Sequence, residues 1–172
     1  VIPWQYTEQY RQLQQATTVP ICTGEDIYLK EGFAPLLEAG ISVIHPDLLT
    51  AGGILETKKI GDMAQEQGVA MAIHMAESPI AAMAAAHVAI ATESFLALEY
   101  HSVDVPWWDD IVTGFDGPIV RNGFIELSDK PGLGIDDLND EVLRQHLQPG
   151  VTDIWQPTDQ WNDDTSWDRT WS

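Results

Sequence analysis

The sequence predicts an α/β fold built on a parallel sheet. Four short apolar runs recur about every 25 residues, a spacing that suits one strand plus one returning helix. Each run ends in a residue that can take part in proton or metal chemistry, namely Glu25, Asp47, His74 or Glu99. If the strands are parallel, these four residues lie at one rim of the sheet, where α/β proteins place their sites.

The predicted elements alternate regularly along the chain. The apolar runs that suit strands occupy residues 19–25, 41–47, 69–74 and 95–99. Segments with helical apolar spacing or alanine enrichment predict helices over residues 7–16, 29–39, 54–67 and 79–91. Gly40 and Gly68 follow two of these segments, as glycine commonly does at a helix C-terminus.

The distribution of the polar strand ends favours a barrel over an open sheet. An open doubly wound sheet usually binds its ligand at one switch point through a glycine-rich turn, whereas every strand here ends in a titratable group, as in a (β/α)8 barrel. Such barrels have eight strands and about 250 residues, so the four strands predicted here are half of one. Because two bare edges of a buried parallel sheet would invite aggregation, we expect a C-terminal piece, completed by upstream residues or by another copy.

The pattern changes near residue 118, which divides the chain into three predicted parts. Residues 1–117 are the C-terminal half of the barrel domain. Residues 118–147 are a β-rich connector, in which the alternation over residues 119–127 predicts an edge strand or a hairpin and residues 140–147 could form a short helix. Residues 148–172 are an acidic tail with four of the seven Trp residues, and their irregular spacing favours anchoring against the body or a partner subunit over ligand binding.

Length and composition indicate a globular chain. A chain of 172 residues with 44% hydrophobic residues is long enough to bury a sizeable core. No apolar run approaches the roughly 20 residues of a membrane span, and the N-terminal residues lack a signal-peptide pattern. The single cysteine, Cys22, cannot form an internal disulfide and fits a reducing cytosol, so we expect a cytoplasmic location.

The charge balance makes nucleic acid a poor partner and indicates a salt-adapted surface. The chain has 27 acidic and 8 basic residues and a formal net charge of −19, whereas a phosphate backbone requires clustered Lys and Arg. Molar salt would screen the self-repulsion of such a surface, because the Debye length is about 3 Å at 1 M. We therefore expect a halophilic protein; the alternative is an acidic mesophilic protein, whose stability would respond differently to KCl.

Each of the four strand-end residues has an ordinary structural explanation when taken alone. Asp47 precedes a loop, where Asp is a common turn residue, and a lone His at the end of an apolar run, such as His74, is more often a hydrogen-bonded core residue. Glu25 and Glu99 are more informative, because a carboxylate that ends a buried strand costs desolvation unless a metal, a partner or water compensates it. Their joint arrangement at one rim favours a site.

Together the four residues predict proton abstraction beside a metal-bound carboxylate. Asp47, on the strand adjacent to His74, would orient the imidazole and raise its basicity, which gives a general base near neutral pH. Glu25 is the predicted ligand of a hard cation such as Mg²⁺. Glu99, if protonated, would donate a hydrogen bond to developing negative charge.

Two other histidines are predicted to approach the substrate. His45 lies two residues before Asp47 and His101 lies two residues after Glu99. Residues two apart point to the same side of a strand, so both imidazoles are candidates for substrate binding. His87, within the alanine-rich segment, is assigned to the surface or to a helix contact.

These motifs resemble those of the mandelate racemase branch of the enolase superfamily. The matching segments are, in order, Thr23-Gly-Glu25, His45-Pro-Asp47 with Ala51-Gly-Gly-Ile54, Ile73-His74, Leu98-Glu99 and Pro131-Gly-Leu-Gly134. They cover about residues 1–147, and their order and spacing make the resemblance specific. The text around Asp47, with Leu96-Ala-Leu-Glu-Tyr-His101 and Pro106-Trp-Trp108, is most similar to the sugar-acid dehydratases of the gluconate, galactonate and xylonate type.

The resemblance implies an enzyme that acts on an aldonic acid chelated to one Mg²⁺. Glu25 corresponds to the third of three carboxylate metal ligands, and Asp47 and His74 correspond to a dyad in which His74 abstracts the proton α to the substrate carboxylate. Glu99 corresponds to the residue that hydrogen-bonds this carboxylate in the metal-stabilised enediolate. Loss of the β-hydroxyl then gives a 2-keto-3-deoxy acid.

Part of the family pattern has no counterpart in this sequence. The first two metal ligands, the opposing acid or base and the N-terminal capping domain, toward which residues 118–147 would pack, are absent from it. We therefore expect the isolated chain to be inactive and the full-length enzyme to be a homo-oligomer. Two alternatives stay open: a racemase or epimerase of the same superfamily, which returns the proton, and a catalytically silent, salt-adapted scaffold domain.

Overall fold

The computed structural model describes residues 2–154 and confirms the predicted parallel α/β fold. The central sheet has four parallel strands, whose order along the sheet is their order along the chain: β1 (Cys22–Thr23), β2 (Val43–Ile44), β3 (Ala70–Ile73) and β4 (Phe95–Leu98). This is the arrangement of successive units in a (β/α)8 barrel. The predicted tail anchors Trp155, Trp161, Trp167 and Trp171 lie outside the described residues.

The first two strands are shorter than the apolar runs that predict them. The runs 19–25 and 41–47 each contain only two residues of strand. Each run also contains a proline, Pro20 or Pro46, which has no N–H to donate to a ladder. Continuous strand is therefore confined to the middle of each run, and toward the rim the pairing goes on as single hydrogen bonds and an isolated bridge.

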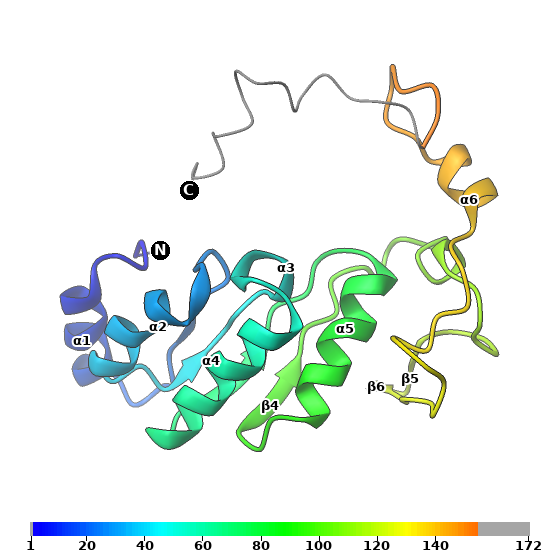
Figure 1. Ribbon diagram of the computed structural model, residues 1–172. Coiled ribbons are helices and arrows are strands. Elements are labelled where there is room, and N and C mark those ends of the chain that lie inside the picture. The colour runs from blue at the N-terminus through cyan, green and yellow to red at the C-terminus, as the bar shows by residue number, and fades with distance from the viewer. Residues whose placement is uncertain (1, 155–172) are drawn as a thin grey trace.

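Helices connect the strands and lie side by side along the sheet (Figure 1). Helix α1 (Thr7–Ala16) precedes β1, and the connecting helices are α2 (Leu29–Glu38), α4 (Ile54–Glu66) and α5 (Pro79–Ile90). Their bounds confirm the four predicted helices to within one residue at each end. A short helix, α3 (Leu48–Ala51), was not predicted, because four residues carry no periodic signal. Among the described residues, no helix has the length and apolar character to cross a membrane.

The main hydrophobic core lies between the sheet and these helices. Burial alternates along β3, where Met71 and Ile73 are fully buried. Phe33 of α2, Ile60 of α4 and Val88 of α5 belong to the same apolar cluster. Helix α5 is buried around most of its circumference, and its alanines, which are small, allow it to approach the sheet closely.

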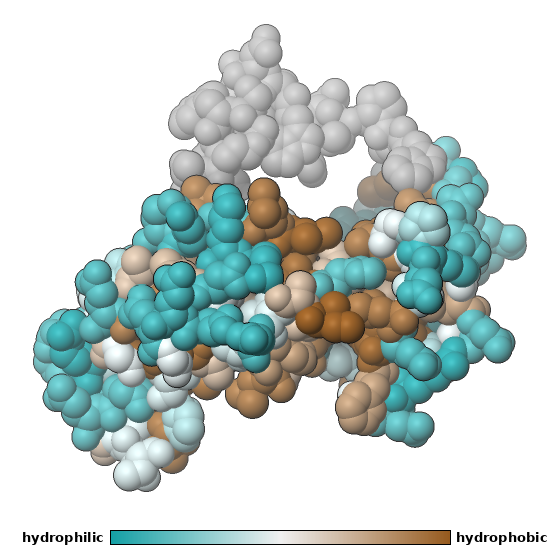
Figure 2. Space-filling view, turned by 60° about the horizontal axis from the view of Figure 1, so that its bottom comes forward, coloured by the Kyte–Doolittle hydropathy of each residue, from teal (hydrophilic) through white to brown (hydrophobic). Residues whose placement is uncertain are grey.

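Each edge strand has a single neighbour within the described part of the chain. Strand β1 pairs with β2 only, and β4 pairs with β3 only. Beside β4, apolar side chains line a groove of about 750 Å³, and Ile90 and Leu96 are 77% and 62% exposed. Figure 2 shows apolar surface in the middle of the molecule, between more hydrophilic flanks. These open edges are the geometry expected of half a barrel.

The segment after β4 forms a hairpin and two short helices. The helices are a 3-10 turn (Asp109–Ile111) and α6 (Asp140–Gln145). Strands β5 (Val120–Arg121) and β6 (Phe124–Ile125) are antiparallel, so of the two predicted forms of residues 119–127, an edge strand or a hairpin, the structure has the hairpin. Asn122 and Gly123 have φ of +53° and +81°, as a two-residue type I′ turn requires.

This segment packs on the half barrel through a second apolar cluster. Trp108 and Ile111 lie in it with Met75, which follows β3, and with Met83 of α5. Ile119 from the start of the predicted connector joins the same cluster. The domain boundary near residue 118 stays a prediction. Residues on both sides of it belong to this second apolar cluster.

Gly24, which precedes Glu25, leaves no room for a side chain. Its φ is +135°, and a Cβ there would lie 2.7 Å from Cε1 of Phe33 and 3.3 Å from the amide N of His45. Phe33 is fully buried and cannot move aside. We expect Gly24→Ala to lower the free energy of unfolding of the full-length protein by about 2–4 kcal/mol, from backbone strain plus overpacking, in a urea titration.

The matched control for this change is Gly68→Ala. Gly68 has φ of +71°, but a Cβ there would have nothing within 4 Å. Only backbone strain applies, which is about 1–2 kcal/mol. Equal losses in the two variants would contradict the packing argument.

Candidate active site

The strand ends lie side by side at one rim of the sheet. The N–H groups of His45, His74 and Glu99 donate to backbone carbonyls of the neighbouring strand segment at 2.9, 3.0 and 2.9 Å. Asp47 and His74 face one another as an isolated parallel bridge beyond the named strands. The ladder therefore continues to the rim and brings the side chains of successive strand ends together.

A short hydrogen bond joins His74 to Asp47. Nδ1 of His74 lies 2.8 Å from Oδ2 of Asp47, whose side chain is 2% exposed. The other carboxylate oxygen, Oδ1, accepts the N–H of Thr50 at 2.9 Å and thereby caps α3. Because Asp47 accepts, Nδ1 carries the proton of the neutral ring, and in that neutral form Nε2 of His74 has the lone pair.

The pairing shifts the pKa values of both residues. Burial by itself would raise the pKa of Asp47, but the hydrogen bonds from His74 and from the Thr50 N–H outweigh burial and lower it. Burial would lower the pKa of His74, but the hydrogen bond to Asp47 and the charge of Glu99 outweigh burial and raise it. His74 is thus a stronger base than an isolated imidazole.

Two carboxylates face the free nitrogen of His74. Oε2 of Glu99 lies 3.6 Å from Nε2, and Oε2 of Glu25 lies 3.8 Å from it. The Glu25 side chain is 56% exposed and the Glu99 side chain 33% exposed. The four residues predicted from the strand ends therefore form one cluster, with the His74 imidazole at its centre.

Of the two further histidines predicted to approach the substrate, the structure brings only one into the cluster. Nε2 of His45 lies 3.3 Å from Oε2 of Glu99, and the imidazoles of His45 and His74 meet edge to face with centroids 5.3 Å apart. His101 is exposed and follows the end of β4, where the chain leaves the sheet. The described contacts do not join His101 to the cluster.

Sequence reasoning missed Glu77, which lies beside Asp47. Burial and the neighbouring Asp47 carboxylate raise the pKa of Glu77. Its backbone carbonyl accepts hydrogen bonds from Nε1 of Trp108 at 2.7 Å and from Oγ of Ser102 at 3.4 Å, which hold its loop in place. Glu77 ends no apolar run; its position three residues after His74 was the one available signal.

Carboxylates at the rim are available for a metal ion. Donor atoms of Asp47, His74 and Glu77 lie within 4.8 Å of one another, close enough to share a cation. In that group, however, the N–H of His74 already points at Asp47, so we assign the group to holding a proton. Glu25 has oxygen donors on an exposed side chain, which suits a hard cation such as Mg²⁺, and it stays the candidate metal ligand.

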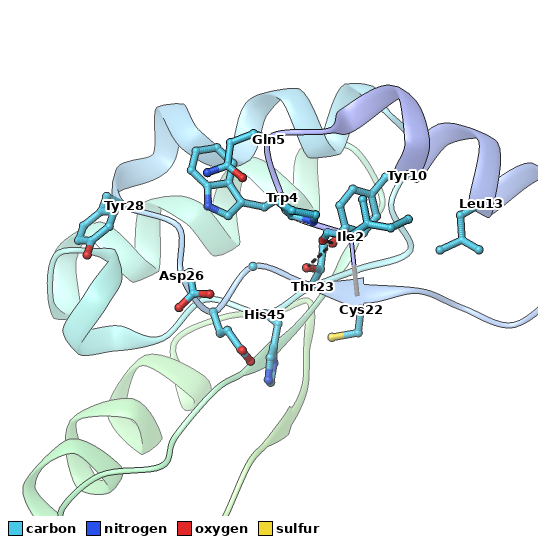
Figure 3. A pocket seen from close by; sticks show the side chains of 13 residues that line it. Ile2, Trp4, Gln5, Tyr10, Leu13, Cys22, Thr23, Asp26, Tyr28 and His45 are labelled. Atoms are coloured by element: carbon cyan, nitrogen blue, oxygen red, sulfur yellow. Dashed lines mark hydrogen bonds between the residues drawn. The ribbon is translucent and has the colours of Figure 1, made fainter. Parts of the chain in front are cut away.

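A groove of about 1210 Å³ opens beside β1 and reaches Glu25 and His45. Figure 3 shows His45 and Cys22 on one side of it and Trp4 and Gln5, from the segment before α1, on the other. The hydroxyl of Tyr10 donates to the carbonyl of Ile2 at 2.5 Å and fastens this segment to α1. The rim cluster is therefore accessible from the open edge of the sheet.

Comparisons with known proteins agree with this geometry. The sequence model of the family described as Enolase C-terminal domain-like matches residues 1–142. D-xylonate dehydratase of Haloferax volcanii is 40% identical over 152 residues, which are 88% of this chain and 36% of that protein. D-gluconate/D-galactonate dehydratase of Picrophilus torridus is 33% identical over 143 residues, which are 83% of this chain and 36% of that protein. The chain spans little more than a third of these relatives.

Solved structures of the mandelate racemase/muconate lactonizing enzyme group are also similar to this chain. A mandelate racemase/muconate lactonizing enzyme-like protein from Rubrobacter xylanophilus superposes with a TM-score of 0.82 at 35% identity, over 87% of this chain and 38% of that one. A mandelate racemase/muconate lactonizing enzyme from Jannaschia sp. superposes with a TM-score of 0.78 at 32% identity, over 90% of this chain and 39% of that one.

The raised pKa of His74 predicts how stability depends on pH. In the unfolded chain His74 titrates near its ordinary value of about 6.5, and in the folded protein its pKa is higher. The pairing therefore stabilises the fold fully below about pH 6.5 and loses this contribution as the pH rises through the folded pKa. In urea titrations of the full-length protein in EDTA, His74→Gln should destabilise more at about pH 5.5 than at about pH 9.

The control uses the partner of the pair. In an Asp47→Asn background, the pH dependence of the His74→Gln effect should shrink, because the main stabilising contact of the imidazolium is gone. A loss from His74→Gln that is the same at both pH values would contradict the assignment.

Proposed function

The chain belongs to the Enolase C-terminal domain-like family as the C-terminal half of its (β/α)8 barrel, and we propose that the full-length protein is a Mg²⁺-dependent aldonic acid dehydratase. The observation that carries the proposal is the Asp47–His74 pair, whose free Nε2 faces Glu99 and Glu25. The sugar-acid dehydratases among the relatives support this choice of reaction and of substrate class.

His74 is the proposed base. Its Nδ1 N–H is held by Asp47, so the lone pair on Nε2 takes the proton α to the substrate carboxylate. The imidazole becomes a cation in this step, and the buried Asp47 carboxylate stabilises that cation at 2.8 Å. Because the pKa of His74 is raised, the proton is accepted more readily than by an isolated imidazole.

Glu99 is the proposed hydrogen-bond donor to the substrate. In its protonated form it would stabilise the negative charge that grows on the substrate carboxylate as the α-proton leaves. The β-hydroxyl then takes a proton from an acid outside this chain and departs as water, which leaves the enol of a 2-keto-3-deoxy acid, and the enol tautomerises to the keto form. Glu25 would hold one coordination position of Mg²⁺, which when bound draws charge from the substrate carboxylate and makes the α-proton more acidic.

A racemase or epimerase is the second candidate from the same family. The Asp47–His74 pair would serve either reaction, and the Rubrobacter xylanophilus structure is named for the mandelate racemase group. The two differ in the fate of the charge after proton removal: dehydration expels the β-hydroxyl, whereas racemisation returns a proton to the same carbon. A silent scaffold domain would do neither.

Several properties of the whole protein belong to the same proposal. The isolated chain is proposed to be inactive, because it supplies one candidate metal ligand and one base. The net charge of −19 supports a salt-adapted surface. A cytoplasmic location and a homo-oligomer complete the proposal.

The test of function is the product formed from sugar acids. Incubated with Mg²⁺ and a panel of C5 and C6 aldonic and aldaric acids in high KCl, the full-length protein should produce an α-keto acid, detected as its semicarbazone. His74→Asn should lower kcat by about 10²–10⁴-fold, because the base is lost, while His87→Asn on α5 should retain activity. Exchange of the α-proton with solvent in the absence of keto acid would favour the racemase, and full activity in His74→Asn would contradict both.

Removal of the metal tests the role of Glu25. EDTA should abolish turnover, and Mg²⁺ should restore it. Glu25→Gln should raise the Mg²⁺ concentration needed for half-maximal activity by at least about tenfold, because a charged oxygen ligand is lost. Asp26→Asn removes the same charge from the adjacent exposed residue and should leave that concentration within about twofold. Equal effects of the two variants would show a general electrostatic contribution and would sink the assignment of Glu25.

A further inference from the structure

The imidazole of His45 has a fixed tautomer. Its Nδ1 lies 3.1 Å from the carbonyl oxygen of Ala72 in β3. A carbonyl oxygen can only accept, so Nδ1 carries a proton whether the ring is neutral or cationic. Nε2 is therefore the nitrogen that is free to donate or accept toward another side chain.

That nitrogen points at Glu99. Nε2 of His45 and Oε2 of Glu99 are 3.3 Å apart, and their side chains are 18% and 33% exposed. Without a proton between them, two lone pairs would face each other at this distance with little water to separate them. A single proton, on either atom, turns this repulsion into a charge-assisted hydrogen bond.

The state of Glu99 supports the same conclusion. Its Oε2 is buried and has no aligned hydrogen-bond partner among the described residues. A buried, unsatisfied carboxylate oxygen is costly, and a small rotation toward His45 with a proton between them removes that cost. His74 is the other ring nearby, at 3.6 Å, but in the proposed reaction its Nε2 is the atom that takes the substrate proton and is bare when it does so.

We propose that His45 and Glu99 share one proton when no substrate is bound, and that His45 is a positioning residue which gives this proton up to Oε2 of Glu99 when the substrate carboxylate arrives, so that the Nε2–H bond breaks, the O–H bond of Glu99 forms and Glu99 donates to the substrate. The role rests on the proposed function, in which Glu99 faces the substrate carboxylate. Without this proton, the carboxylate of Glu99 and the carboxylate of the substrate would repel each other. His45 thus acts on the substrate through Glu99, and the histidines on either side of Oε2 have opposite duties: His45 supplies a proton and His74 accepts one.

The shared proton is tested without turnover, by ¹⁵N NMR of histidine-labelled full-length protein in EDTA. His45→Gln assigns the two ring resonances. Nδ1 of His45 should appear protonated, and Nε2 should lie between the bare and the protonated positions. Glu99→Gln should move Nε2 to the bare, hydrogen-bond-accepting position, because Gln donates from its own amide. An Nε2 resonance that is the same with Glu or Gln at position 99 overturns the proposal.

Kinetics test whether His45 acts through Glu99. Because Gln at position 99 brings its own N–H, it has no need of a proton from His45. His45→Gln should therefore lower kcat by about tenfold in the wild type, with a smaller change in KM, and by less than about twofold in a Glu99→Gln background. His87→Gln is the matched control and should change neither.

An equal loss from His45→Gln in both backgrounds would show that His45 acts independently of Glu99, and would overturn the positioning role. If the full-length protein turns over no sugar acid, the proposed function fails. The NMR comparison still decides whether the proton is shared, so the two failures are distinguishable.

Discussion

The site depends on the register between β2 and β3, which places Nδ1 of His74 2.8 Å from Oδ2 of Asp47. A shift of one residue in either strand would turn one of the two side chains to the other face of the sheet. The N–H of His74, which donates to the carbonyl of Pro46, holds that register at the rim itself. The imidazole tautomer, the raised pKa of His74 and the direction of the Nε2 lone pair all follow from this one pairing.

Most of the fold could be predicted from the sequence, because its signals are local. The helices follow from apolar spacing and from glycines such as Gly40 and Gly68, and these signals need no knowledge of distant residues. The lengths of β1 and β2 could not be predicted in the same way. An apolar run marks an extended, buried segment, whereas a strand also needs N–H groups in register, and Pro20 and Pro46 lack them.

The site was predictable where its residues end strands, and only there. His45 and His101 had the same signal, a position two residues from a rim carboxylate. Only His45 reaches the cluster, because its backbone N–H is still paired with Thr23 of the neighbouring strand. His101 lies beyond the end of β4, where the chain is no longer a strand. Glu77 reaches Asp47 from a loop that Trp108 holds in place from 31 residues away, and no local pattern reports such a contact.

The two oxygens of Asp47 have different roles. Oδ2 accepts a hydrogen bond from His74, and Oδ1 accepts the N–H of Thr50 and so caps α3. A descendant of this protein without the proposed reaction would still be selected to keep Asp47, because the helix cap is needed by the fold. His74 has no such second duty to the backbone of a helix and would be free to drift. Among diverged copies, the presence of His74 is therefore a better guide to surviving chemistry than the presence of Asp47.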